Sequence, residues 1–203
     1  QLANMAKQAK SVLAMESLTA VADRGYYRSE DIQECEKANI TSYLPKPNTS
    51  GNRAKGQFDR NDFRYIAEED EYECPAGLRL VHHMTTQQQG KTTHAYWTYK
   101  CRYCDIKVQC TSGVHRKMTR WEHEEVLEAA QARLDHNPDM MHIRRATVEH
   151  PFGTLKAWMG STHFLTKTLD RVSTEMSLHV LAYNMKRMMN IFGPKTLIEA
   201  IGA

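Results

Sequence analysis

Hydrophobic and polar positions over the first 45 residues change between the period of a helix and that of a strand. Residues 1–15 are good helix formers with their apolar side chains roughly on one side. Residues 18–22 form a short apolar run that suits a buried strand. A second helix is predicted from Ser29, a suitable N-cap, to about Ala38, and a second strand over 40–44. This order predicts an α/β fold.

The pattern changes after Pro45. Residues 45–62 are rich in Pro, Asn, Gly and charged side chains, which predicts a loop or linker. The following residues have the two-residue alternation of strands, and we expect a short hairpin over 63–74 and a longer one over 78–100. Because helical patterns resume afterwards, this middle section is predicted to be a β-rich insert.

Helical periodicity dominates the last part of the chain. Thr119 is expected to cap a helix that runs to about Leu134, with Trp121 packed against the core. Residues 175–192 predict a strongly apolar helix that ends at Gly193. We expect its methionines to fill a core, namely Met185, Met188 and Met189.

Together these patterns predict an α/β domain in three parts, with a first part over 1–45, the insert over 46–116 and C-terminal helices over 117–203. A chain of 203 residues with 41% hydrophobic and 25% charged side chains is ordinary for a soluble globular protein. No apolar run approaches the ~20 residues of a membrane span, and no signal peptide is visible. We therefore expect a cytoplasmic protein without a membrane partner.

The net charge of +3 permits nucleic-acid binding without indicating it. The charges are unevenly distributed. Residues 46–64 and 107–120 are basic, whereas residues 66–74 hold five carboxylates.

Four of the five cysteines fall in the predicted insert. Because no secretory signal is visible, a disulfide framework is not expected. Two interpretations remain: a structural Zn²⁺ site, or reduced cysteines that only pack or retain a lost site. The candidate ligands are Cys74, Cys101, Cys104 and Cys110, with His82, His83, His94 and His115 as substitutes. The fifth, Cys35, is expected to be an inert buried thiol.

Arg145, Glu149 and Lys156 project from one face when their segment is wound as a helix at about 100° per residue. Beside them runs an apolar stripe expected to be buried, namely Val148, Phe152, Leu155, Trp158 and Met159. The pattern fits an exposed ion pair between Arg145 and Glu149, or a helix that aims one carboxylate. Pro151 favours the second interpretation, because a proline inside a helix costs about 3 kcal/mol.

Asp23 follows the first predicted strand, and Gly25 supplies a turn just after it. Ligands of open α/β sheets gather at the carboxyl ends of strands, although an aspartate there is also a common cap or turn residue. Asp23 and Glu149 together would suit Mg²⁺, which prefers oxygen ligands. A pair of such ions supports phosphoryl transfer.

Two motifs carry a resemblance to a known family. Asp23-Arg24-Gly25-Tyr26 matches an Asp-x-Gly-Tyr turn, and Arg145, Glu149 and Lys156 match a Tyr-x2-Arg-x3-Glu-x6-Lys signature, with His142 in the place of the tyrosine. With these motifs the chain resembles the DDE transposases of bacterial insertion sequences. The similar group has an RNase H-like catalytic domain that is interrupted by a β-rich insert.

The resemblance implies DNA transposition, in which Mg²⁺ or Mn²⁺ supports phosphodiester hydrolysis and strand transfer. It makes Asp23 and Glu149 catalytic metal ligands and places Arg145 and Lys156 at DNA phosphates. The implied partners are double-stranded DNA, at the element ends and the target, and a second copy in a synaptic complex. Such a protein is nucleoid-associated when bound to DNA.

The family's first catalytic Asp lies well upstream of the second, yet residues 1–22 contain no Asp. We therefore expect an incomplete RNase H-like domain, the C-terminal portion of a transposase, that cannot cut or join DNA alone. The alternative is a non-catalytic remnant that binds DNA or regulates transposition. An RNase H-like nuclease unconnected with transposition fits the Arg, Glu and Lys spacing less well.

Overall fold

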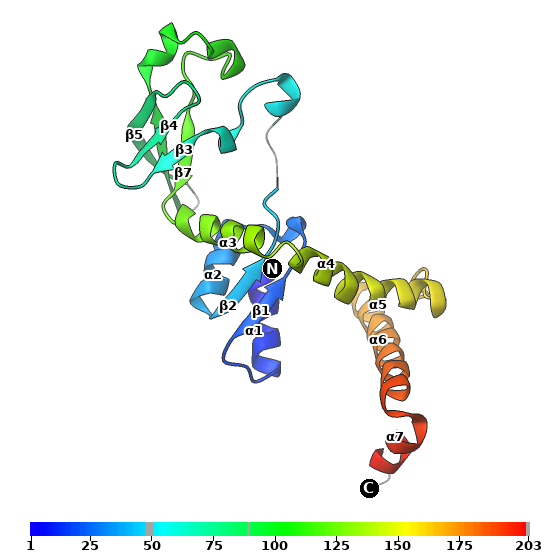
Figure 1. The fold of residues 1–203 in the computed structure, drawn as a ribbon. Coiled ribbons are helices and arrows are strands. Elements are labelled where there is room, and N and C mark those ends of the chain that lie inside the picture. Colours follow the sequence, from blue (N-terminus) through cyan, green and yellow to red (C-terminus); the bar gives the residue numbers. More distant parts are fainter. Residues whose placement is uncertain (48–50, 89, 202–203) are drawn as a thin grey trace. The chain divides into compact units, whose positions relative to one another are not determined.

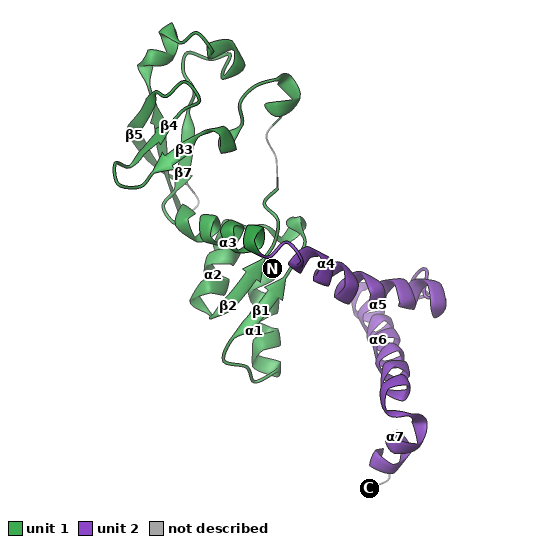
Figure 2. Ribbon diagram, in the orientation of Figure 1, with its two compact units in different colours: residues 1–136 green, residues 137–203 purple. Residues whose placement is uncertain are grey.

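The computed structural model describes residues 1–47, 51–88 and 90–201. The chain divides into two compact units, unit 1 over residues 1–136 and unit 2 over residues 137–203 (Figure 2). None of the described helices is long and apolar enough to cross a membrane.

Unit 1 begins with a small α/β layer (Figure 1). Strands β1 (Leu18–Val21) and β2 (Ile40–Tyr43) are parallel, and α2 (Ser29–Lys37) connects them. A parallel pair requires such a crossover, because a tight turn can join only antiparallel strands. Helix α1 (Leu2–Val12) precedes β1. The predicted order of helix, strand, helix and strand is confirmed.

The middle of unit 1 is a five-stranded antiparallel sheet with its strands in sequence order. Its members are β3 (Arg64–Ile66), β4 (Glu71–Glu73), β5 (Arg79–Gln88), β6 (Lys91–Trp97) and β7 (Met118–Trp121). Both predicted hairpins are present. The predicted loop before them contains only two 3₁₀ turns among its described residues, η2 (Arg53–Lys55) and η3 (Arg60–Asp62).

The predicted helix cap at Thr119 is wrong. Thr119 lies in β7, opposite Ala95 of β6. The reason is the burial pattern: Met118, Arg120 and Trp121 are buried, and Thr119 is exposed, which suits a strand at this point of the sheet. Helix α3 (Glu124–His136) begins only after this strand.

Unit 1 holds two hydrophobic cores. The first joins the α/β layer to α3, and its buried members include Ile32, Cys35, Ile40, Trp121 and Leu127. The second lies in the insert and consists of Phe63, Tyr72, Leu80, Tyr96, Cys110 and Met118. Trp121 and Cys35 are buried as predicted, with exposed fractions of 7% and 0%. Helix α3 thus packs the chain after the insert back onto the layer before it.

Unit 2 consists of helices. Four helical segments follow without a break: α4 (Met140–Arg144), η6 (Arg145–Glu149), α5 (His150–Gly153) and η7 (Thr154–Trp158). Helices α6 (Leu169–Phe192) and α7 (Pro194–Ile201) come next. Helix α6 begins six residues before the predicted Glu175 and ends at Gly193 as predicted, where φ is +81°.

The apolar side chains of unit 2 are mostly exposed. Leu155 is its only fully buried side chain among residues 137–201. The prediction that the methionines of α6 fill a core is therefore wrong, since Met185, Met188 and Met189 are 55%, 45% and 45% exposed. The stripe beside Glu149 was also expected to be buried, yet Trp158 is 82% exposed. A pattern of apolar residues needs an opposing surface, and unit 2 supplies little of one within itself.

Candidate active site and cysteine cluster

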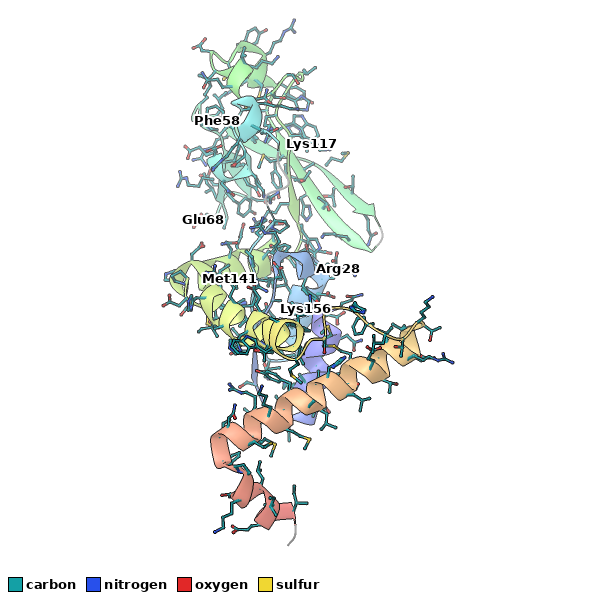
Figure 3. All side chains as sticks on the ribbon, turned by 90° about the vertical axis from the view of Figure 1, so that its right-hand side faces the viewer. Arg28, Phe58, Glu68, Lys117, Met141 and Lys156 are labelled. Carbon is teal, nitrogen blue, oxygen red and sulfur yellow. The ribbon has the colours of Figure 1, made fainter. Side chains whose placement is uncertain are left out.

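Two turns of the helical run in unit 2 are π-helical, and the three residues predicted to act together lie in them. Arg145 and Glu149 open and close η6, and η7 contains Lys156, which is labelled in Figure 3. The amide of Met159 donates to the carbonyl of Thr154 at 3.0 Å, across five residues instead of four. Single π turns inside α-helices are frequent at functional sites.

Pro151 explains part of this geometry. It is the second residue of α5, two residues after η6 ends, and the helical run continues through it without a break. Because proline has no amide hydrogen, the regular helical bond to the Thr147 carbonyl cannot form. The hydroxyl of Thr147 donates to the carbonyl of Ile143 at 2.8 Å and so satisfies one acceptor of the widened turn.

Glu149 pairs with Arg144 and not with Arg145. Arg144 Nη2 lies 2.9 Å from Glu149 Oε1, at the five-residue separation that a π turn brings together. Of the two interpretations of this face, the ion pair between Arg145 and Glu149 is therefore not the one that the structure shows. Glu149 is 56% exposed, and pairs at the surface contribute at most about 1 kcal/mol to stability. The main effect of Arg144 is to fix where the carboxylate points.

Arg145 and Lys156 form no ion pair with any residue in the described part of the chain, and both are exposed. Lys156 lines a pocket of ≈ 340 Å³ within unit 2. The polar residues around it are Ser161, Thr162, His163 and His179. Ser161 Oγ lies 2.9 Å from His179 Nδ1. Lys156 therefore has hydroxyl and imidazole groups as neighbours and no carboxylate in the pocket lining.

Asp23 lies two residues beyond the carboxyl end of β1 and is exposed. Its Oδ1 accepts a hydrogen bond from the Arg24 amide at 2.6 Å, which caps the 3₁₀ turn η1 (Arg24–Tyr26). The turn is present as predicted. Asp23 belongs to unit 1 and Glu149 to unit 2. Within the described ranges, no three His, Cys, Asp or Glu side chains are already arranged as ligands of one metal ion.

The four cysteines of the insert line one small cavity of ≈ 20 Å³. Cys74, Cys101, Cys104 and Cys110 are all free thiols. Burial raises the pKa of the Cys110 thiol, Arg116 acts in the opposite direction, and the other three cysteines raise that pKa further. The sequence-based grouping of these cysteines is thus reproduced in space.

The substitute histidine ligands do not line this cavity. His82 and His94 both lie 3.0 Å from the hydroxyl of Thr85. His83 and His115 stack on Trp97, with ring centroids 4.1 and 5.2 Å away. His82, His83 and His94 belong to strands β5 and β6, and His115 lies in the loop before β7.

A cleft of ≈ 760 Å³ in unit 1 was not predicted. Glu124 at its wall has a side chain only 8% exposed, 3.0 Å from Arg60 and 3.4 Å from Lys46. Glu128, also in the lining, pairs with Arg120. The ion pairs of Glu124 with Arg60 and Lys46 thus link α3 to the residues before the sheet. Sequence spacing carries no signal for this link, since Lys46 and Glu124 are 78 residues apart.

Glu149 is exposed on the same helical run as Arg145 and Lys156, two cations without an ion pair in the described part of the chain. Residues 73–189, more than half of the chain, match the family model described as a transposase DDE domain, and the chain belongs to this family of DDE transposases. The match includes Arg145, Glu149, Lys156 and the four cysteines, whereas Asp23 precedes it. No curated protein and no solved structure matches the chain.

Proposed function

We propose that Asp23 and Glu149 are two of the three carboxylates that hold Mg²⁺ or Mn²⁺ in the RNase H-like active site of a transposase. The observation that carries the proposal is the exposure of the Glu149 carboxylate. Its carboxylate is 56% exposed on a π turn, and the family match covers it. Arg144 contacts Oε1, and no hydrogen bond from the described residues reaches Oε2. One oxygen therefore stays open for a ligand.

The residues fit the metal. Asp and Glu supply the hard oxygen ligands that Mg²⁺ prefers, and both side chains are exposed. When bound, a metal pair activates a water or a 3′-hydroxyl for attack on a phosphodiester and stabilises the leaving oxygen. The part of Asp23 and Glu149 is to hold and space the ions, and Arg144 keeps the Glu149 carboxylate oriented. A closed four-thiolate zinc site in the insert would take no part, because it leaves no position for water.

Arg145 and Lys156 are proposed to bind the DNA backbone. Neither has a competing anion among the described residues, so each can neutralise a phosphate. The hydroxyls of Ser161 and Thr162 beside Lys156 add donors of the type that phosphate oxygens accept. The basic residues 107–120 of unit 1 are proposed to bind duplex DNA as well, and Lys117 is exposed there. The proposed assembly on DNA is a homodimer in a synaptic complex.

A two-metal site needs a third carboxylate, and residues 1–22 contain no Asp. The 203-residue chain alone should therefore leave supercoiled plasmid intact in the presence of Mg²⁺. Strand cleavage by the purified chain that Glu149→Gln abolishes would contradict this expectation.

The catalytic assignment is tested with the chain joined to an in-frame upstream segment that carries an Asp on a predicted strand. Asp23→Asn and Glu149→Gln should each lower transposition frequency at least about 10²-fold, the scale of losing one charge-stabilising group. Asp139→Asn and Glu199→Gln are matched controls, because both carboxylates are exposed and lie outside the proposed site. Equal losses of transposition frequency in the controls would contradict the assignment.

The alternative is a remnant that binds DNA without cutting it. Binding by itself is tested through salt. Lys156→Ala and Arg145→Ala should each reduce the slope of log affinity against log salt by about 1, because each loses one phosphate contact. Lys195→Ala, an exposed cation in α7, is the matched control. If the extended chain binds DNA but never transposes, the remnant is the better description.

A further inference from the structure

The segment between β6 and β7 contains little regular structure. Residues 98–117 contain only two 3₁₀ turns, η4 (Tyr99–Tyr103) and η5 (Lys107–Gln109). Loops of this length without regular structure are uncommon inside compact domains. Its apolar side chains do not form a core of their own: Tyr103, Val108 and Val114 are 82%, 85% and 75% exposed.

The segment is fastened at few points. The Phe58 amide donates to the Gln109 carbonyl at 2.8 Å, and Gln57 Nε2 donates to the Val108 carbonyl at 3.5 Å. Figure 3 labels Phe58, which also lines the cysteine cavity. The segment's other contacts with the sheet include the burial of Cys110 in the insert core and the ring contacts of Tyr99 with His83 and of His115 with Trp97.

The four cysteines meet where this segment joins the sheet. Cys74 follows β4, and its carbonyl accepts from the Gly77 amide at 2.8 Å in a tight turn. Cys101 and Cys104 lie at a second turn, in which the Cys104 amide donates to the Cys101 carbonyl at 3.4 Å. Cys110 follows η5 and lies in the insert core. A metal ion bound by Cys74 on the sheet side and by the three cysteines of the segment 98–117 would connect this segment to the sheet.

We propose that Cys74, Cys101, Cys104 and Cys110 bind one structural Zn²⁺ that fixes residues 98–117 to the sheet. The cavity that all four line measures ≈ 20 Å³, and a space of roughly 10–15 Å³ already holds one water-sized particle. Zinc takes four thiolates as a tetrahedron with Zn–S distances of about 2.3 Å. Such a site is closed, and it stabilises the fold without taking part in catalysis.

The charges around the cavity suit four thiolates. Four thiolates and one Zn²⁺ carry a net charge of about −2. Lys107 and Arg116 line the same cavity, and no carboxylate does. Two cations therefore offset the charge of the bound site.

Packing alone does not account for all four cysteines. Cys74 and Cys110 belong to the insert core, whereas Cys101 is 8% exposed and belongs to neither core of unit 1. Among the described side chains, the thiols are not yet turned into a ligand set. A cysteine side chain reaches its other staggered positions by one rotation about Cα–Cβ, and the proposal requires the four sulfurs to turn toward the cavity that they line.

The test uses the full 203-residue chain, purified under reducing conditions from zinc-supplemented medium. Elemental analysis should find about one zinc per chain, and Cys101→Ser and Cys104→Ser should each lower this to less than about a tenth, because a three-thiolate site loses its closed shell. Cys35→Ala, a buried thiol of the other core, is the matched control and should keep the full zinc content. Equal zinc in wild type and Cys104→Ser overturns the proposal.

A second measurement does not depend on whether the variants fold. After chelation, the wild-type chain is titrated with Co²⁺, which reports tetrahedral thiolate ligation by visible absorption, and then with Zn²⁺, which should displace it at one equivalent. Zinc should also slow proteolysis within 98–117. A chain that takes up neither metal, or one whose proteolysis is unchanged by zinc, contradicts the proposal.

Discussion

Unit 1 holds two hydrophobic cores, whereas unit 2 is a succession of helices with one buried side chain among its described residues. Both units contain apolar side chains at helical spacing. In unit 1 these residues face strands or another helix, and burial removes their surface from water, which stabilises the fold by about 25 cal/mol per Å². We therefore expect most of the folding free energy to come from unit 1, although the predicted catalytic helix belongs to unit 2.

The largest contrast is expected for truncation of apolar side chains. Leu80 is 0% exposed in the insert core, and Leu80→Ala should lower the free energy of unfolding by about 2–5 kcal/mol. Ile191 of α6 is 63% exposed, and Ile191→Ala should cost about 0.5 kcal/mol or less. Urea denaturation followed by circular dichroism measures both. Equal losses in the free energy of unfolding would contradict this contrast and show that unit 2 buries the Ile191 side chain in solution.

Arginine pairs provide a second, smaller contrast. Arg120 is 9% exposed, contacts Glu128 with two hydrogen bonds and lies 3.7 Å over the ring of Tyr65. Arg120→Ala should therefore cost about 1–3 kcal/mol, and Arg144→Ala at most about 0.5 kcal/mol. The same denaturation experiment applies. If Arg144→Ala cost as much as Arg120→Ala, the ion pair of the π turn would be structural and not merely orienting.

The smallest effect concerns acid. The Leu165 amide, together with the hydroxyl and amide of Thr166, donates to Glu175 and lowers its pKa from 4.5 to about 2. A lowered pKa stabilises the folded form above pH 4.5, and this contribution is lost as the pH falls from 4.5 through 2. Far-UV circular dichroism of wild type should show a loss of helix in that window that Glu175→Gln lacks. A wild-type profile that is flat there would contradict the contact.

The fold of unit 1 could largely be predicted, because apolar runs of strand length and turn residues specify its hairpins and its crossover. Strand β7 was missed, because four residues directly before a helix are too few for their hydrophobic periodicity to distinguish a strand from a helix. The cysteine cluster was predicted from spacing, and the cavity brings its members together. The pairing of Glu149 was not predictable at 100° per residue, because a π turn shifts the partner from Arg145 to Arg144.

Strands β1 and β2 pair only with each other among the described residues. Each therefore keeps one row of backbone amides and carbonyls open at its outer edge. An open edge accepts a further strand from any polypeptide with a compatible pattern, and at high concentration the nearest one is another copy of the same chain. Self-association of the purified chain should then rise with concentration, and a separately supplied strand peptide should compete with it.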